Sequence, residues 1–164
     1  MRLLHNCLAA AIALLTALQG LRAQDIVVVP CDGSVSGTYC YVDNDDHSWQ
    51  WQSECPGDPI DLKFTSGTIE GSAYDLLIIY DGPDDLAPLL YANPLGTEYQ
   101  DLTDLEVIST GMDIFMTLNS NATNCCATGG LLGGGLSEWI FSASSGSASA
   151  GIHEEQAGNF TMYP

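Results

Sequence analysis

Residues 60–82 read IDLKFTSGTIEGSAYDLLIIYDG and carry the clearest secondary-structure pattern in the chain. Ile60, Leu62 and Phe64 alternate with polar residues, which is the period of a strand with one buried face. Leu76–Tyr80 is apolar at every position, which predicts a central strand covered on both faces. The turn residues Asp81 and Gly82 end it.

Similar short segments lie on both sides of this stretch, separated by turn residues such as Asp32-Gly33 and Asn93-Pro94. They are residues 26–29, 39–42, 48–52, 89–91, 105–109, 114–118 and 139–143. The last two segments before residue 120 are expected to form a hairpin around residues 110–113. No window has the period of a long amphipathic helix. The pattern predicts an all-β, antiparallel two-sheet sandwich of about eight or nine strands.

The two ends of the chain differ from the middle in composition. Residues 1–23 have the features of a signal peptide, because Arg2 precedes an apolar core too short to span a bilayer and Ala23 offers a cleavage site. An uncleaved membrane anchor is the alternative. We assign residues 24–143 to the sandwich and residues 144–157 to a linker rich in Ser, Gly and Ala.

The chain is strongly acidic, with 3 Lys and Arg against 21 Asp and Glu and a net charge of −18. Loss of Arg2 and Arg22 with the leader leaves one Lys, Lys63, and a net charge of −20. Nucleic acids and anionic membranes bind proteins through Lys and Arg clusters, so the composition argues strongly against both as partners. No segment after the leader is long and apolar enough to insert into a membrane. Divalent cations and basic partners are favoured.

Five cysteines follow the leader, which predicts two disulfides and one remaining thiol in an exported protein. The preferred pairing joins Cys31 to Cys40, and Cys55 to one of the adjacent Cys125 and Cys126. An alternative joins Cys31 to Cys55. Zinc-type spacings are absent.

The segments Ile60–Phe64, Ile69-Glu70 and Tyr74–Gly82 resemble the central signature of CUB domains, and residues 108–121 resemble the hairpin and loop that follow it. Residues 137–141 depart from the family's final strand, so the chain looks like a divergent bacterial relative. The resemblance implies a CUB-like jelly roll. It also implies a secreted or cell-surface, non-catalytic module that binds an extracellular protein or a glycan.

The ending Phe160-Thr-Met-Tyr-Pro164 resembles the first residues of the sorting tail of Bacteroidetes proteins exported through the type IX system. Residues 158–164 are therefore interpreted as the start of a truncated sorting tail. This resemblance implies release from the cell or attachment to the bacterial surface.

Some CUB domains bind Ca²⁺ between loops, and the resemblance places that site at Glu70, Asp75 and Asn121. Asn121 replaces a carboxylate of the family, which predicts a weaker site, and Thr123 offers a further oxygen from the same loop. Ca²⁺ accepts carboxylate, amide and hydroxyl oxygens. The alternative is that Asp75 caps a turn and Glu70 is a solvated surface group.

Trp49 and Trp51 are two residues apart and so point to the same side of a strand. On an exposed face they would stack on a sugar or a partner side chain, whereas in a sandwich at least one of them is expected in the core. Tyr74 is a further candidate ligand contact.

No arrangement typical of a catalytic nucleophile is present, and the three His lie apart in the sequence, at positions 5, 47 and 153. The sequence therefore predicts no enzymatic activity. Two other functions stay open: a carbohydrate-binding accessory module with the Trp pair as its platform, and the non-catalytic part of a larger exported hydrolase.

Overall fold

The computed structural model describes residues 23–96, 98–128 and 136–146, which form eleven strands and one 3-10 turn. The elements are β1 (Ala23–Val29), β2 (Ser34–Tyr39), β3 (Asp46–Ser53), β4 (Ile60–Ser66), β5 (Thr68–Glu70), β6 (Leu76–Tyr80), β7 (Leu89–Ala92), β8 (Tyr99–Asp101), β9 (Glu106–Ile108), β10 (Asp113–Asn119), η1 (Cys126–Thr128) and β11 (Trp139–Ser145).

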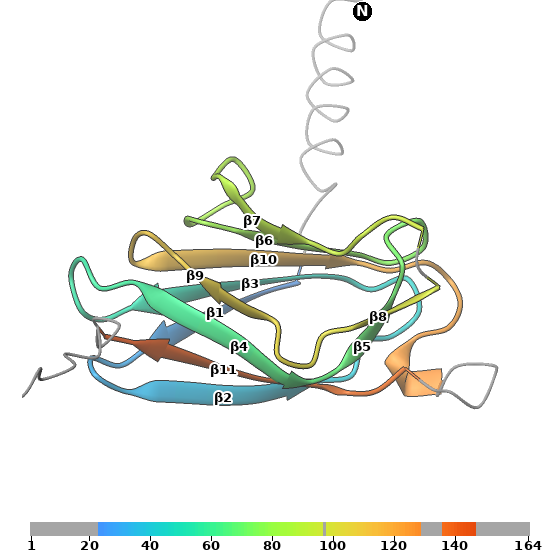
Figure 1. Cartoon of the computed structure of the whole chain (residues 1–164), viewed down its shortest axis with the longest axis horizontal. Coiled ribbons are helices and arrows are strands. Elements are labelled where there is room, and N and C mark those ends of the chain that lie inside the picture. The colour runs from blue at the N-terminus through green and yellow to red at the C-terminus, as the bar shows by residue number, and fades with distance from the viewer. Residues whose placement is uncertain (1–22, 97, 129–135, 147–164) are drawn as a thin grey trace, which may run out of the picture.

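The strands form two main sheets and a short extra ribbon (Figure 1). Sheet A has the order β1-β3-β10-β6-β7, and sheet B has the order β2-β11-β4-β9. The ribbon pairs β5 with β8. The all-β sandwich is confirmed, with one parallel pair, β1 with β3, among otherwise antiparallel neighbours.

The core lies between the two sheets and follows the period-two pattern of the sequence. Ile60, Leu62 and Phe64 of β4 are fully buried, as are alternate residues of β10 and β6. Trp51 and Trp139 are the largest fully buried side chains. Burial of such large aromatic side chains, at about 25 cal/mol per Å² of apolar surface, is the main force that holds the sheets together.

Three expectations about strands need correction. β9 and β10 do not form a hairpin, because β9 pairs with β4 in sheet B while β10 pairs with β3 and β6 in sheet A. β2 precedes the predicted segment 39–42, since its exposed positions are Ser and Thr rather than apolar residues. β6 buries only alternate residues, and Leu76 on its other face is 37% exposed.

The disulfides join Cys31 to Cys55 and Cys40 to Cys126. The preferred Cys31–Cys40 pairing is therefore wrong, and the alternative Cys31–Cys55 pairing is confirmed. The parallel alignment explains it: Val29 of β1 lies opposite Ser53 of β3, so the residues just beyond both strands meet. Cys125 is buried and belongs to neither disulfide.

The sandwich extends slightly beyond its predicted boundaries. β1 begins at Ala23, and β11 runs to Ser145, two residues into the predicted linker. Residues 1–22 of the predicted leader, residues 147–157 of the linker and the predicted sorting tail lie outside the described residues. Within the described ranges, no helix has the length and apolar character needed to cross a bilayer.

Candidate binding site at the acidic loops

Two buried carboxylates lie together where the ribbon meets the loops of sheet A. Glu70 is the last residue of β5, Asp75 directly precedes β6, and Asn121 follows β10. Asp75 is fully buried and Glu70 is 4% exposed. The structure thus brings the three residues predicted from the family resemblance into one network, which we call the acidic site.

Asp75 is held by hydrogen bonds from two directions. Its Oδ2 accepts a bond of 2.8 Å from the hydroxyl of Tyr41, and its Oδ1 accepts one of 2.9 Å from the backbone N–H of Asn121. Burial raises the pKa of Asp75, and the nearby charge of Asp43 adds to the rise, while the two hydrogen bonds oppose it.

Glu70 accepts its hydrogen bonds from side-chain amides. Asn124 Nδ2 donates to Oε1 at 2.9 Å, and Asn121 Nδ2 donates to Oε2 at 3.4 Å. Burial raises the pKa of Glu70, with a further rise from Asp75 and Glu98, and the two amides lower it. The acidic site therefore holds two carboxyl groups whose charged forms are disfavoured by their surroundings.

Thr123 fixes the orientation of Asn121. Asn121 Oδ1 accepts bonds from the backbone N–H of Thr123 at 2.7 Å and from its hydroxyl at 3.2 Å. The amide nitrogen is thereby turned toward Glu70. The predicted Thr123 oxygen is bonded to Asn121 and touches neither carboxylate in any hydrogen bond of the described residues.

Asn93 positions both carboxylate residues through their backbone. Its Nδ2 donates to the carbonyl oxygens of Glu70 and Asp75, each at 2.9 Å, and its Oδ1 accepts from the N–H of Leu77 at 2.9 Å. Asn93 is 3% exposed. This single buried amide ties the end of β5 to the start of β6.

Sequence reasoning did not identify Tyr41, Asn93 and Asn124 as parts of the site. The sequence predicts a turn at Asn93-Pro94, and Tyr41 lies far from Asp75 and Glu70 in the sequence, so no local pattern points to these two residues. Asn124 directly follows Thr123, and its place in the loop that begins at Asn121 is the one signal that could have identified it.

The oxygen atoms of the acidic site suit Ca²⁺, a hard cation that prefers carboxylate and amide oxygens. Glu70 and Asp75 supply two carboxylates, and the buried Oδ1 of Asn124 accepts no hydrogen bond. Among the described residues, no group of three or more His, Cys, Asp or Glu is arranged to hold a metal. A cation here would therefore depend on neutral amide and backbone oxygens, in keeping with weak binding.

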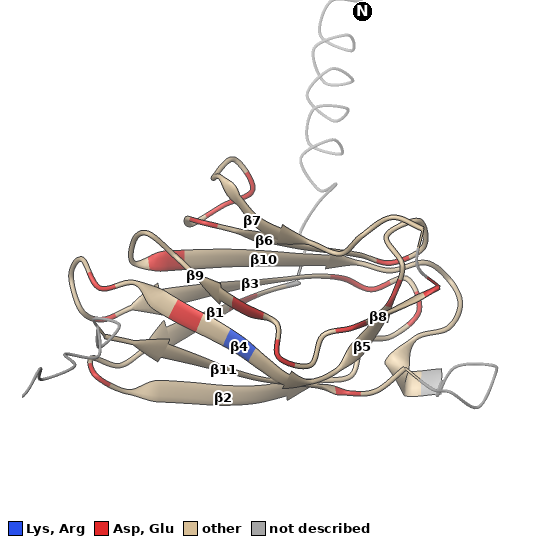
Figure 2. Cartoon of the chain, in the orientation of Figure 1, with Lys and Arg blue, Asp and Glu red and all other residues tan. Residues whose placement is uncertain are grey.

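Exposed apolar side chains surround the acidic site. Tyr74, in the turn before Asp75, is 57% exposed, and Tyr99, which pairs with Glu70 across the ribbon, is 37% exposed. Leu95 is 78% exposed and follows Pro94, whose carbonyl accepts a bond from Ser72. Figure 2 shows the acidic residues gathered mainly in the loops at the strand ends.

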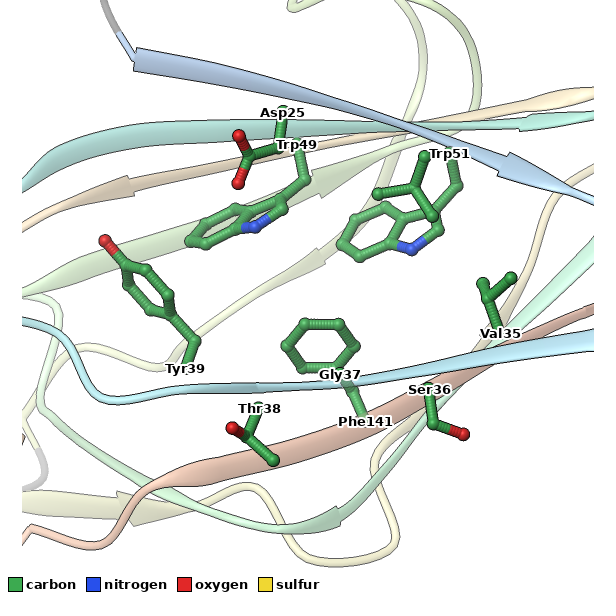
Figure 3. Close-up of a pocket in the computed structure, with 10 residues that line it drawn as sticks. Asp25, Val35, Ser36, Gly37, Thr38, Tyr39, Trp49, Trp51 and Phe141 are labelled. Atoms are coloured by element: carbon green, nitrogen blue, oxygen red, sulfur yellow. The ribbon is translucent and has the colours of Figure 1, made fainter.

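Trp49 and Trp51 do not form the exposed platform considered above. They are 3% and 0% exposed, because odd-numbered positions of β3 face sheet B. Their rings stack at 6.5 Å and 19° beside a slot of about 210 Å³ between edge strands β1 and β2 (Figure 3). Both rings therefore pack in the core, with Phe141 at 5.7 Å from Trp51.

No protein-family model matches the sequence. No curated protein matches it either. Among solved structures, the chain is similar to the CUB1-EGF-CUB2 domains of rat MASP-1, with 14% identity, a TM-score of 0.51, and coverage of 74% of this chain and 42% of that chain. It thus spans about two fifths of the rat structure.

Two further similar structures are the full extracellular region of zebrafish Gpr126/Adgrg6 and the CUB1-EGF-CUB2 domain of human MASP-1/3. The first has 16% identity and a TM-score of 0.49, covering 75% of this chain and 15% of that chain. The second has 16% identity and a TM-score of 0.48, covering 68% and 42%. At such identities the likeness to the rat structure concerns the fold alone, and the described residues form a CUB-like β-sandwich.

Proposed function

We propose that this chain is a secreted or cell-surface, non-catalytic module that binds an extracellular partner at the acidic site, with Ca²⁺ as a stabilising ion. Export is supported by the leader-like residues 1–23 and by two disulfides, which persist in oxidising compartments. The resemblance of residues 160–164 to a type IX sorting tail adds delivery to the bacterial surface to this proposal.

One observation carries the proposal: Glu70 and Asp75 are buried together, and the described chain supplies no cation to them. Lys63 is the only Lys or Arg in the described ranges, and it pairs with Glu106 at 3.5 Å on β4 and β9. Burying a charge without a counter-charge is costly, so a cation from outside the chain that binds there offsets part of this cost.

Ca²⁺ would be held by the carboxylates of Glu70 and Asp75 with amide oxygen from Asn124, and it would neutralise their charge. Asp43 and Glu98 lie close enough to raise the pKa of Asp75 and Glu70, respectively. These two acids are left to attract a Lys or Arg of the partner. Tyr74, Leu95 and Tyr99 offer the apolar contact that such a side chain and its neighbours need.

The test is binding of the folded, oxidised chain to an array of random 15-residue peptides in Ca²⁺ and in chelator. We expect retained peptides to carry Lys or Arg beside an apolar residue, and binding to fall in chelator. Glu98→Gln should weaken binding about tenfold, the loss of one well-placed charge contact.

Glu54→Gln is the matched control, because Glu54 is also exposed and follows the end of β3 opposite to Asp46, which pairs with Asn119 near the acidic site. It should leave the affinity unchanged. An equal loss in both variants would reveal general charge attraction, and retained peptides without basic residues would reject the proposed partner chemistry.

A further inference from the structure

The outer face of sheet A contains a row of uncharged side chains that crosses all five strands. The pairing registers align Ile26 with Gln50, Gln50 with Phe115, Phe115 with Tyr80, and Tyr80 with Leu89. We call this row the neutral platform. Five strands spaced by about 4.8 Å give it a width of about 19 Å.

The neutral platform is open to solvent, especially at its two ends. Ile26 is 66% exposed and Leu89 is 61% exposed, while Gln50, Phe115 and Tyr80 between them are partly exposed. Exposed apolar side chains gathered on one face of a soluble domain mark an interaction surface.

The platform alternates apolar surface with neutral hydrogen-bonding groups. The rings of Tyr80 and Phe115 lie 6.2 Å apart and tilted by 34°. On β1 and β3, Gln24 donates to Gln50 at 3.3 Å, and Gln50 in turn donates to Asp113 Oδ1 at 3.2 Å. The adjacent row in register also lacks charge and consists of Gln24, Ser48, Thr117, Ile78 and Ala92. Ser48 and Thr117 in this row are buried.

The charge distribution of the chain indicates which kind of ligand can bind to this face. With a net charge of −18, the chain repels acidic ligands and a second copy of itself. A basic partner is drawn to the acidic loops, since the acidic residues of β3 and β10 on this face, Asp46 and Asp113, stand at strand ends, and Asp113 is hydrogen-bonded to Gln50. A neutral partner has no charge that would draw it to the acidic loops, and it can contact both the rings and the amides of the platform.

We infer that the neutral platform binds an uncharged, extended polysaccharide. The C–H faces of sugar rings would pack on Tyr80 and Phe115, and the sugar hydroxyls would bond to the exposed amide of Gln24. This site is separate from the acidic site. It would provide the sugar-binding surface that the sequence suggested for Trp49 and Trp51.

The test is native affinity electrophoresis of the folded chain in gels that contain hydroxyethylcellulose, arabinoxylan or galactomannan, with polygalacturonate as the acidic comparison. We expect retardation by at least one neutral polymer and none by polygalacturonate. Phe115→Ala should weaken retardation about tenfold, as loss of an interface anchor does.

Ile26→Ser gives a second variant whose side chain is too exposed for the change to unfold the chain, and Ile108→Ser is its control on sheet B, where Ile108 is 48% exposed. Ile26→Ser should weaken retardation, and Ile108→Ser should not. The inference is overturned if no neutral polymer retards the chain or if both Ile variants behave alike. It is also overturned if sedimentation shows a dimer that Ile26→Ser dissociates.

Discussion

At the scale of single residues, the acidic site combines burial with amide donors. Asn121 and Asn124 turn their N–H groups toward Glu70, while Asp75 receives a tyrosine hydroxyl and a backbone N–H. These neutral donors offset part of the cost of burying two charges. The pKa values of Glu70 and Asp75 are still raised, so the donors do not offset the whole cost.

The raised pKa values make stability depend on pH. The folded pKa of Asp75 lies above the unfolded value of about 4, so the folded chain keeps a proton that the unfolded chain releases. The resulting stability is complete below the unfolded pKa and is lost as the pH rises through the folded pKa. In chelator, the free energy of unfolding should therefore decrease as the pH rises from about 4 through the folded pKa, by about 1.4 kcal/mol for each unit of difference between the two pKa values.

Asp75→Asn should flatten this pH dependence, because Asn cannot lose a proton. Asp104→Asn is the control: Asp104 is exposed and sits at φ 65°, a backbone conformation that Asn tolerates well. Thermal melting from pH 4 to pH 7.5, monitored by circular dichroism, measures both. Equal slopes in the two variants would show that general charge repulsion, and not Asp75, governs the effect.

The resemblance to CUB domains identified Glu70, Asp75 and Asn121, and the structure places them in one network. Tyr41 could not be predicted, because only the folded chain brings it to Asp75, whereas Asn124 lies in the same loop as Asn121 and could have been considered with it. The burial of both Trp49 and Trp51 was also undecided, since a period of two shows which residues share a face but not which face is covered.

At the scale of elements, the sequence predicted long strands better than short ones. β4 alternates clearly, β10 has a run of large apolar residues, and both strands appear where expected. β5 and β8 have three residues each, too few for a period to be visible, and β2 is polar on its open face. The hairpin expected before β10 failed because the chain crosses there from sheet B to sheet A.

Asn93 links β5, β6 and the end of β7, so its loss should loosen all three. Asn93→Ala leaves two buried carbonyls and the N–H of Leu77 without their partner, which should destabilise the chain by about 2 to 4 kcal/mol. Asn119→Ala, at an exposed position that ends β10, should change stability by less than about 0.5 kcal/mol. Urea unfolding measures both values, and similar small losses would show that Asn93 does not hold these elements.

At the scale of the whole molecule, the fold separates two surfaces of different chemistry. Acidic residues gather mainly in the loops (Figure 2). The outer face of sheet A presents neutral amides and rings. Two disulfides, with sequence separations of 24 and 86 residues, stabilise the small sandwich by restricting its unfolded chain. Loops and one open sheet face are thereby left to bind partners.

A calcium titration of the refolded, oxidised chain tests the acidic site most directly. The titration is monitored by two-dimensional amide NMR at pH 7.5 in about 150 mM salt, which screens the attraction of loosely held ions to surface charges. We expect the amides of Asn121 and its loop to shift along one saturable curve, with a dissociation constant of about 10⁻⁴ to 10⁻³ M, and Asp75→Asn to abolish that curve. Shifts that never saturate, or a curve that Asp75→Asn leaves intact, would contradict a cation held by Glu70 and Asp75.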